Sequence, residues 1–161
     1  MPLRGACCVP DSANVKPHMH PYSFIVSLRA NHPSRDISFL SNIFLLDRRH
    51  GWTAGDERKT PTGTLLGGTR KESYWSARVT TEETSSEEWQ LEDILDRSIA
   101  EVLSHESELA EFFATGGTMN YFIGLYGVRN YGLVFPLALM NKLAKAKVEL
   151  QLDVYPYQSA A

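Results

Sequence analysis

Alternating apolar and polar positions mark four short segments of the chain as strands of a half-exposed sheet. In residues 22–29, the apolar side chains of Phe24, Val26 and Leu28 occupy every second position. Successive side chains of a strand point to opposite faces, so this pattern predicts one buried face and one solvated face. The same alternation predicts three further strands, at residues 74–79, 119–126 and 148–155.

Apolar positions spaced three or four residues apart predict helices between these strands. The clearest pattern follows a helical period through Leu91, Ile94, Leu95, Ile99, Val102 and Leu103. We also expect a helix at residues 35–46 capped by Ser34, a short helix that ends at Gly116, and a last helix at residues 136–145. Residues 52–71 contain proline and several glycines, which predicts a loop or a loop with one short strand.

Strands and helices alternate along the chain, and this order predicts an α+β fold. Strands buried on both faces have continuous apolar runs, so alternating strands indicate a sheet that is covered on one face. We expect a two-layer α/β sandwich of ferredoxin-like character, with a mixed sheet of four or more strands and helices on one face. An irregular N-terminal arm at residues 1–20 would precede this single domain at residues 21–158. The open face would carry Ser27, Arg29, Ser76, Arg78, Phe122, Tyr126, Gln151 and Tyr155.

Composition and charge are those of a globular protein with one acidic segment. The 161 residues have a net charge of −3, and residues 82–111 hold eleven acidic residues against one basic residue, Arg97. We interpret this segment as a solvated helix surface, with a partner-binding surface as the alternative. The sequence has no apolar run long enough to span a membrane, no signal-peptide core and two adjacent cysteines, which together predict a cytoplasmic location.

No sequence motif predicts a cofactor, a metal centre or a known catalytic mechanism. The sequence has neither a Gly-x-Ser-x-Gly elbow nor a Walker-type phosphate loop. His18 and His20 form a pair that lacks a convincing third metal ligand nearby. Cys7 or Cys8 in an irregular arm is poorly placed for a nucleophile. We therefore expect no metal and no cofactor.

Two of the three tryptophans, Trp52 and Trp75, flank a basic segment that suits a binding site. Asp56 follows a glycine, and this pair predicts a tight turn. One interpretation makes both tryptophans anchors of the core. The other makes them the aromatic wall of a pocket with one carboxylate and several cations. The candidate ligand-binding or partner-binding residues are Trp52, Asp56, Arg58, Trp75, Arg78 and Tyr126.

The order of these features resembles the bacterial domain-of-unknown-function family 4279. The resemblance covers residues 22–156, and its most specific part is the Trp52-x-x-Gly55-Asp56 turn followed by the strand that contains Trp75-Ser76. The family pattern brings the two tryptophans closer together, so residues 60–68 resemble an insertion. The resemblance implies a small intracellular bacterial protein and carries no activity with it.

Two classes of function fit these observations. The first is a non-catalytic binding or protein-interaction module. It would use the open sheet face or the Trp52 loop, either like an immunity protein that binds a basic partner or as a homodimer. The second is a small-ligand sensor or an enzyme with a pocket around Trp52, Asp56, Arg58 and Trp75. Basic residues near the tryptophans also suit nucleic acid, but a pI of 5.9 and the acidic segment argue against it.

Overall fold

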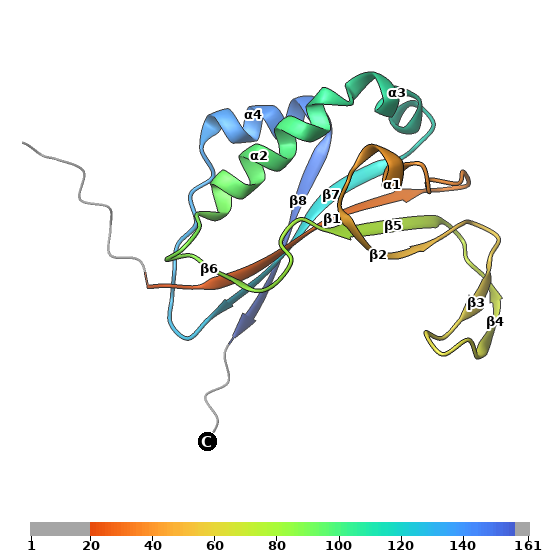
Figure 1. Cartoon of the computed structure of the whole chain (residues 1–161), viewed down its shortest axis with the longest axis horizontal. Helices are drawn as coiled ribbons and strands as arrows, with labels where there is room; N and C mark the ends of the chain where they lie inside the picture. The colour runs from red at the N-terminus through yellow and green to blue at the C-terminus, as the bar shows by residue number, and fades with distance from the viewer. Residues whose placement is uncertain (1–19, 157–161) are drawn as a thin grey trace, which may run out of the picture.

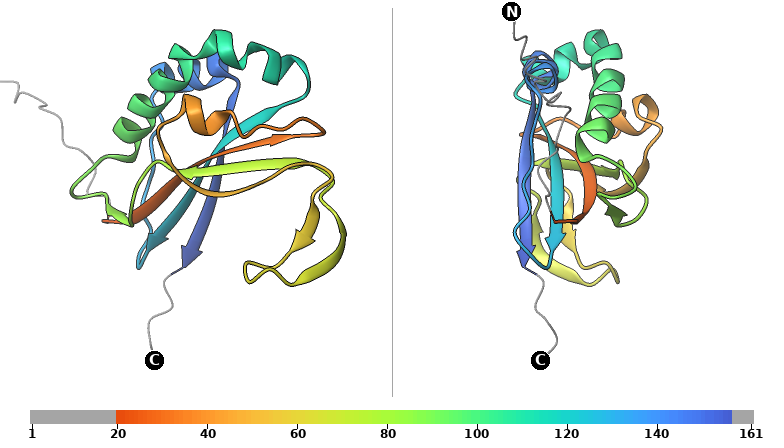
Figure 2. Two further views of the ribbon diagram at one scale, coloured as in Figure 1. Left: turned by 45° about the vertical axis from the view of Figure 1, so that its right-hand side comes forward. Right: turned by 90° about the vertical axis from the view of Figure 1, so that its left-hand side faces the viewer.

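The computed structural model describes residues 20–156 and shows a two-layer α+β sandwich, which confirms the predicted fold class (Figure 1). A six-stranded sheet forms one layer, and the helices lie to one side of it (Figure 2). The strands are β1 (Ser23–His32), β2 (Asp47–Trp52), β3 (Glu57–Lys59), β4 (Leu65–Thr69), β5 (Ser73–Arg78), β6 (Thr84–Ser85), β7 (Thr118–Gly127) and β8 (Val148–Pro156). The helices are α1 (Leu40–Ile43), α2 (Leu91–Ser104), α3 (Glu106–Ala114) and α4 (Leu137–Ala146). The predicted arm at residues 1–20 lies outside the described residues, apart from His20.

The sheet is mixed, and β1 lies at its centre. Five strands follow the order β2-β5-β1-β7-β8, and the short β6 pairs with the beginning of β1. Neighbouring strands are antiparallel except β7 and β8, which are parallel and are joined through α4. Parallel neighbours need such a crossover connection, because a tight turn reverses the chain. β3 and β4 form a separate hairpin that projects from the main sheet (Figure 1).

Burial along β1 explains why the sheet has one covered face and one open face. Phe24, Val26 and Leu28 are completely buried beneath the helices, whereas Ser27 and Arg29 between them are half-buried. The period of two in the sequence therefore becomes a difference between the two faces of the sheet. The same difference extends to β5 and β7, whose core-side residues are also buried.

The helix layer is fixed to the sheet by apolar contacts and by a few polar contacts. α2 buries the apolar stripe that its sequence predicts, and the Tyr121 hydroxyl on β7 donates a 2.7 Å hydrogen bond to Ser98 Oγ on α2. Lys142 of α4 binds both carboxylate oxygens of Asp96 on α2, at 2.7 and 2.8 Å. α2 and α4 therefore lie side by side on the sheet. Within residues 20–156, no helix combines the length and the apolar character of a membrane span.

The helix predicted at residues 35–46 is wrong in extent, because the structure has only the four-residue α1 there. The Asp36 carboxylate accepts hydrogen bonds from the backbone N–H and the hydroxyl of Ser38, at 2.8 and 3.1 Å. Local side-chain bonds of this kind are typical of turns and of helix starts, and here they fix the turn that leads into α1. Phe44 then has an extended backbone, with ψ of 114°. Its side chain is still buried, so the apolar pattern here reflects core contacts rather than a long helix.

The segment at residues 52–71 is more regular than the predicted loop, and β2 is a strand that the sequence pattern does not predict. The first four residues of β2 are exposed, because this strand forms an edge of the sheet and packs little against the core. All residues of β3 and β4 are exposed as well. Strands without a buried face leave no apolar alternation in the sequence, and periodicity therefore cannot reveal them.

Candidate functional site: the open face of the sheet

The sheet face opposite the helices gathers aromatic and arginine side chains from five strands. The strand register places Trp52 beside Tyr74 at one edge and Tyr126 beside Tyr155 at the other. All eight residues that the sequence predicts for this face lie on it, as the register across β5, β1, β7 and β8 requires. We call this surface the open face and define it by Arg29, Trp52, Arg70, Tyr74, Arg78, Phe122, Tyr126 and Tyr155.

Two stacked pairs of side chains lie on the open face between β1 and β8. The Arg29 guanidinium lies 3.4 Å from the centroid of the Phe122 ring, which is a cation–π contact. The Tyr126 and Tyr155 rings stack with centroids 5.0 Å apart and an interplanar angle of 10°. Gly124 permits this arrangement, because a Cβ there would lie 3.1 Å from the Tyr126 hydroxyl oxygen. Four side chains from three strands thus form two ordered pairs on the same face of the sheet.

Tyr155 is held in place by a carboxylate from its own strand. Its hydroxyl donates a hydrogen bond to Asp153, which lies two positions earlier on the same face of β8. This bond raises the pKa of the Tyr155 phenol above its ordinary value, because ionisation would break it and place two negative charges together. The hydroxyl therefore acts as a neutral donor, and the pair fixes the ring that stacks on Tyr126.

A second stacked cluster lies at the β2–β5 edge of the open face. The Trp52 and Tyr74 rings stack with centroids 4.7 Å apart, and the Arg70 guanidinium lies 3.9 Å from the Trp52 ring. Beside them, Asn31 on β1 donates a 3.1 Å hydrogen bond to the Glu72 carboxylate. On both parts of the open face an arginine therefore lies over an aromatic ring: Arg29 over Phe122 and Arg70 over Trp52.

The open face carries both arginines and carboxylates such as Asp153, whereas the helix layer is strongly acidic. None of the ion pairs found within residues 20–156 includes Arg29, Arg70 or Arg78. Most acidic residues of the segment 82–111 lie on α2 and α3, on the other side of the sheet, whereas Glu83 in the connection before them accepts a hydrogen bond from Ser23 of β1. Within the described chain, the protein therefore presents arginines without carboxylate partners on one side and a concentration of carboxylates on the other.

The structure does not gather the four residues of the predicted pocket. Trp75 lies on the helix side of β5, where it is 1% exposed and its Nε1 donates a 2.8 Å hydrogen bond to Ser41 Oγ. Trp52, on the neighbouring strand, lies on the open face. Asp56 closes the predicted turn by accepting a 2.7 Å hydrogen bond from the Thr53 N–H, and Arg58 is exposed on the projecting hairpin. Trp75 is thus a core anchor, and of the six candidate residues Trp52, Arg78 and Tyr126 share the open face.

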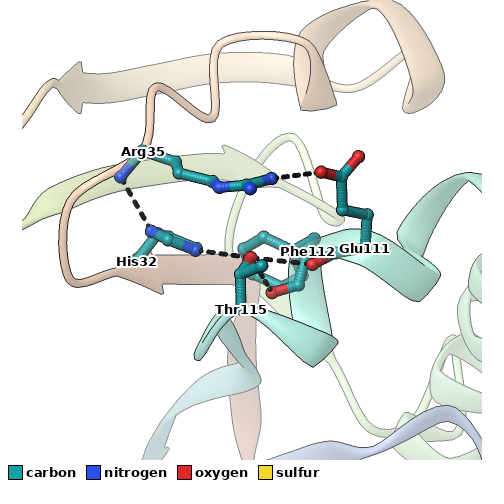
Figure 3. Close-up of polar contacts among 5 residues, drawn as sticks. All are labelled: His32, Arg35, Glu111, Phe112 and Thr115. Carbon is teal, nitrogen blue, oxygen red and sulfur yellow. Dashed lines mark hydrogen bonds and ion pairs between the residues drawn. The ribbon is translucent and has the colours of Figure 1, made fainter.

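His32 is a buried polar side chain that sequence reasoning does not single out (Figure 3). Its Nδ1 accepts hydrogen bonds from the backbone N–H groups of Ser34 and Arg35, at 3.2 and 2.8 Å. Nδ1 therefore carries no proton, and Nε2–H donates a 3.0 Å hydrogen bond to Thr115 Oγ1. Arg35 also pairs with Glu111 of α3. Both ring nitrogens are used, so His32 ties the end of β1 to α3 rather than serving as a base.

The surface is also hollowed outside the centre of the open face, and one of the hollows borders that face at Tyr155. A groove of about 600 Å³ lies at the end of β7 and β8, and its apolar lining includes Leu133, Leu152 and Val154. A hollow of about 300 Å³ lies over His32 and is rimmed by charged side chains of Arg35 and Glu111. Within the described part of the chain, no three histidine, cysteine, aspartate or glutamate side chains are grouped to hold a metal. The His18–His20 pair falls partly outside that part.

Comparison with known proteins gives the family of this chain without giving an activity. No curated protein and no solved structure matches it. One family model, described as a domain of unknown function, matches residues 47–157. This match covers well over half of the chain, from β2 through β8, and so includes both tryptophans and most of the open face. The chain therefore belongs to the family Domain of unknown function (DUF4279).

Proposed function

We propose that this protein is a non-catalytic interaction module whose open face binds an acidic surface of another protein. The observation that carries the proposal is the presence of Arg29, Arg70 and Arg78 on one uncovered face without ion-pair partners in the described chain. Arginine, tyrosine and tryptophan are the side chains most enriched where protein interfaces concentrate their binding energy. A carboxylate of a partner would supply the counter-charge that these arginines lack.

The stacked arrangement of the open face favours recognition without large rearrangement. Arg29 and Arg70 are already held against the rings of Phe122 and Trp52. A guanidinium fixed in this way loses less conformational entropy on binding than a free one. The aromatic side chains beside it exclude water from the new ion pairs, which strengthens them.

An acidic protein surface suits the open face better than nucleic acid or a second copy of the same face. Bases bind sheet surfaces by stacking on exposed rings, whereas here Phe122 is covered by Arg29 and Trp52 by Arg70. Two open faces in contact would place arginines against arginines.

The proposal is tested by using the immobilised protein to capture a binding partner. The variants lose arginines either from the open face or from the helix layer. The full chain is immobilised as wild type, as Arg29→Ser with Arg78→Ser, and as Arg97→Ser. Arg97 is a matched control, because it also lies near an aromatic ring, 5.0 Å from the Trp89 centroid, but belongs to α2. We expect a protein from the native host to bind the wild type and the Arg97→Ser variant and to be lost from the double variant.

The captured protein is then purified, and its affinity is measured by titration at several salt concentrations. Binding through arginines and carboxylates weakens as salt rises. A partner that the double variant retains and that Arg97→Ser loses would assign recognition to the acidic helix layer, in the manner of an immunity protein, and would overturn the proposal for the open face. Circular dichroism of each variant shows that lost binding does not result from unfolding.

A further inference from the structure

The strand β8 leaves one edge of the sheet unpaired over its full length. It pairs with β7 at nine consecutive register positions, from Val148 to Pro156, without a bulge. On its other side the described part of the chain supplies no strand. A long, regular edge presents a row of free backbone N–H and C=O groups and is a template for pairing with another strand.

The opposite edge of the sheet is protected against such pairing by basic side chains and a bulge, whereas β8 has no bulge and its charged residues are the two carboxylates Glu149 and Asp153. β2 begins with Asp47, Arg48 and Arg49, all exposed, and its register with β5 shifts between Arg48 and His50. Charges and bulges of this kind are how natural sheets protect their edges. β8 contains no lysine or arginine, and its proline is at the last position. The two edges of one sheet therefore differ in the way expected if only β2 must stay unpaired.

Exposed apolar side chains concentrate around the β8 edge. Of the eleven large hydrophobic side chains that are exposed in residues 20–156, five belong to β8 or α4: Leu137, Met140, Leu152, Val154 and Tyr155. Exposed Val128 lines the same groove as Leu152 and Val154. Leu152 and Val154 point to the helix side of the sheet, opposite the buried Ile123 and Leu125 on β7, yet they are 42% and 58% exposed. The core is thus incomplete at this edge.

Exposed side chains of α4 continue this apolar surface from β8 onto the helix layer. Leu139 and Leu143 face the core, and Lys142 faces α2 through its ion pair with Asp96. Met140 lies one residue after Leu139, so its side chain projects about 100° around the helix, on the side away from α2. That side faces the β8 edge. α4 and β8 therefore present one apolar surface along a single side of the protein.

We propose that β8 pairs antiparallel with β8 of a second copy, about a two-fold axis that passes through Leu152. Leu152 is the middle residue of the nine-residue strand, so this axis allows the longest pairing. It places Leu150 opposite Val154 of the second copy, and it keeps the helices of both copies on the same side of one continuous sheet. This inference does not rest on the function proposed for the open face.

Charge selects the same register over its nearest alternatives. An axis at Gln151 would place Glu149 opposite Asp153, and an axis at Asp153 would place that carboxylate opposite its own copy. Like charges directly opposite each other destabilise strand pairs. The axis at Leu152 pairs Asp153 with Gln151 and Glu149 with Tyr155, and so avoids both repulsions. The sequence of β8 is thus complementary to itself in the register that also gives the longest pairing.

The surface is large enough for a specific dimer. Nine residues of strand extend about 30 Å, and a helix laid on a sheet gives a side about 20 Å high. These dimensions give about 600 Å² per copy, or about 1,200 Å² in total, which is the lower end for stable specific interfaces. Pairing would also close the apolar surface around Leu152 and Val154 and add backbone hydrogen bonds at the edge.

The test measures the mass of the full chain by sedimentation, across a wide range of concentration, for the wild type and three variants. We expect a dimer for the wild type and a monomer for Leu152→Lys and for Val154→Lys. Leu152→Lys would place two lysines opposite each other on the axis, and Val154→Lys would place a lysine opposite the apolar Leu150 of the second copy. Leu66→Lys is the matched control, since Leu66 is equally apolar and 54% exposed but lies on the β3–β4 hairpin, and it should remain dimeric. A monomeric wild type, or a dimer that both β8 variants leave intact, would overturn the proposal.

A disulfide cross-link tests the register independently of any loss of fold. Cys7 and Cys8 are first replaced by serine, and Leu152→Cys is then introduced. Residues directly opposite on antiparallel strands have Cα atoms about 4.5–5.5 Å apart, within the range of a disulfide. We expect Leu152→Cys to form a covalent dimer under mild oxidation, and Gln151→Cys, which would lie opposite Asp153, to form much less. Equal cross-linking at both positions would reject the axis at Leu152.

Discussion

Trp52 and Trp75 project from neighbouring strands onto opposite faces of the sheet. Gly51 is the residue that pairs with Trp75 across β2 and β5, and Trp52 pairs with Tyr74. A shift of one position between the two indoles thus places one beneath the helices and the other on the open face. Trp75 is therefore a core residue, whereas Trp52 is a residue of the open face.

This arrangement predicts unequal effects of the two Trp→Ala substitutions. Trp75→Ala removes a buried ring that contacts Phe44 and leaves the Ser41 hydroxyl without its donor, so it should lower the free energy of unfolding by about 3–5 kcal/mol. Trp52→Ala removes one ring stack and one cation–π contact at a half-buried position, and should cost about 1–2 kcal/mol. Urea denaturation of the two variants measures both values. Equal losses would show that Trp52 also anchors the core.

The elements that the sequence predicts well are those with one buried face. β1, β5, β7 and β8 each begin within one or two residues of their predicted bounds, and α2 carries the apolar period that the sequence shows. β2, β3 and β4 escape prediction because nearly all their residues are exposed. The predicted helix at residues 35–46 fails for the opposite reason, since Ile37, Leu40 and Phe44 are buried from an irregular segment.

The sequence predicts which residues lie on the open face, but it does not predict which of their side chains contact each other. Period-two alternation alone is enough to place Arg29, Phe122 and Tyr126 on that face. It does not show that Arg29 lies over Phe122, because that contact crosses from β1 to β7 and depends on the order of strands in the sheet. Tyr74 becomes a partner of Trp52 only through β2, the strand that periodicity does not reveal.

His32 is expected to stabilise the fold through its acceptor nitrogen. His32→Ala removes the acceptor of two backbone N–H groups in a buried site and should lower the free energy of unfolding by about 2–4 kcal/mol. His32→Asn should recover part of that loss, because its side-chain oxygen can take the place of Nδ1. Urea denaturation gives both values, and His50→Ala on the exposed β2 edge is the control with little expected change. An Asn variant as unstable as the Ala variant would contradict this assignment.

The β3–β4 hairpin is expected to be dispensable for folding. All residues of its strands are exposed, and the chain is already closed at its base, where the Arg70 N–H donates a 2.8 Å hydrogen bond to the Asp56 carbonyl. Replacing residues 57–69 by Asn-Gly would leave a two-residue turn of a common hairpin type. We expect the free energy of unfolding to change by less than about 1 kcal/mol, because shortening an exposed loop has a small effect. Loss of the cooperative thermal transition would show that the hairpin contributes to the core.

Alkaline pH should weaken the fold through two tyrosines on the helix side of the sheet. Burial raises the pKa of Tyr22 to about 12 and also raises that of Tyr121 well above its ordinary value. Below pH 10 both phenols are protonated in the folded and unfolded chain, so their contribution to stability is fully present. Above pH 10 the unfolded chain loses these protons first, and stability falls as pH rises toward the folded pKa.

Urea denaturation between pH 8 and 11 should show this decline, and Tyr22→Phe should make it shallower, because phenylalanine does not ionise. Tyr155→Phe gives the comparison for an exposed tyrosine whose pKa is raised mainly by its hydrogen bond to Asp153 and only secondarily by burial. A decline of equal slope in the wild type and Tyr22→Phe would show that other groups control the alkaline limit.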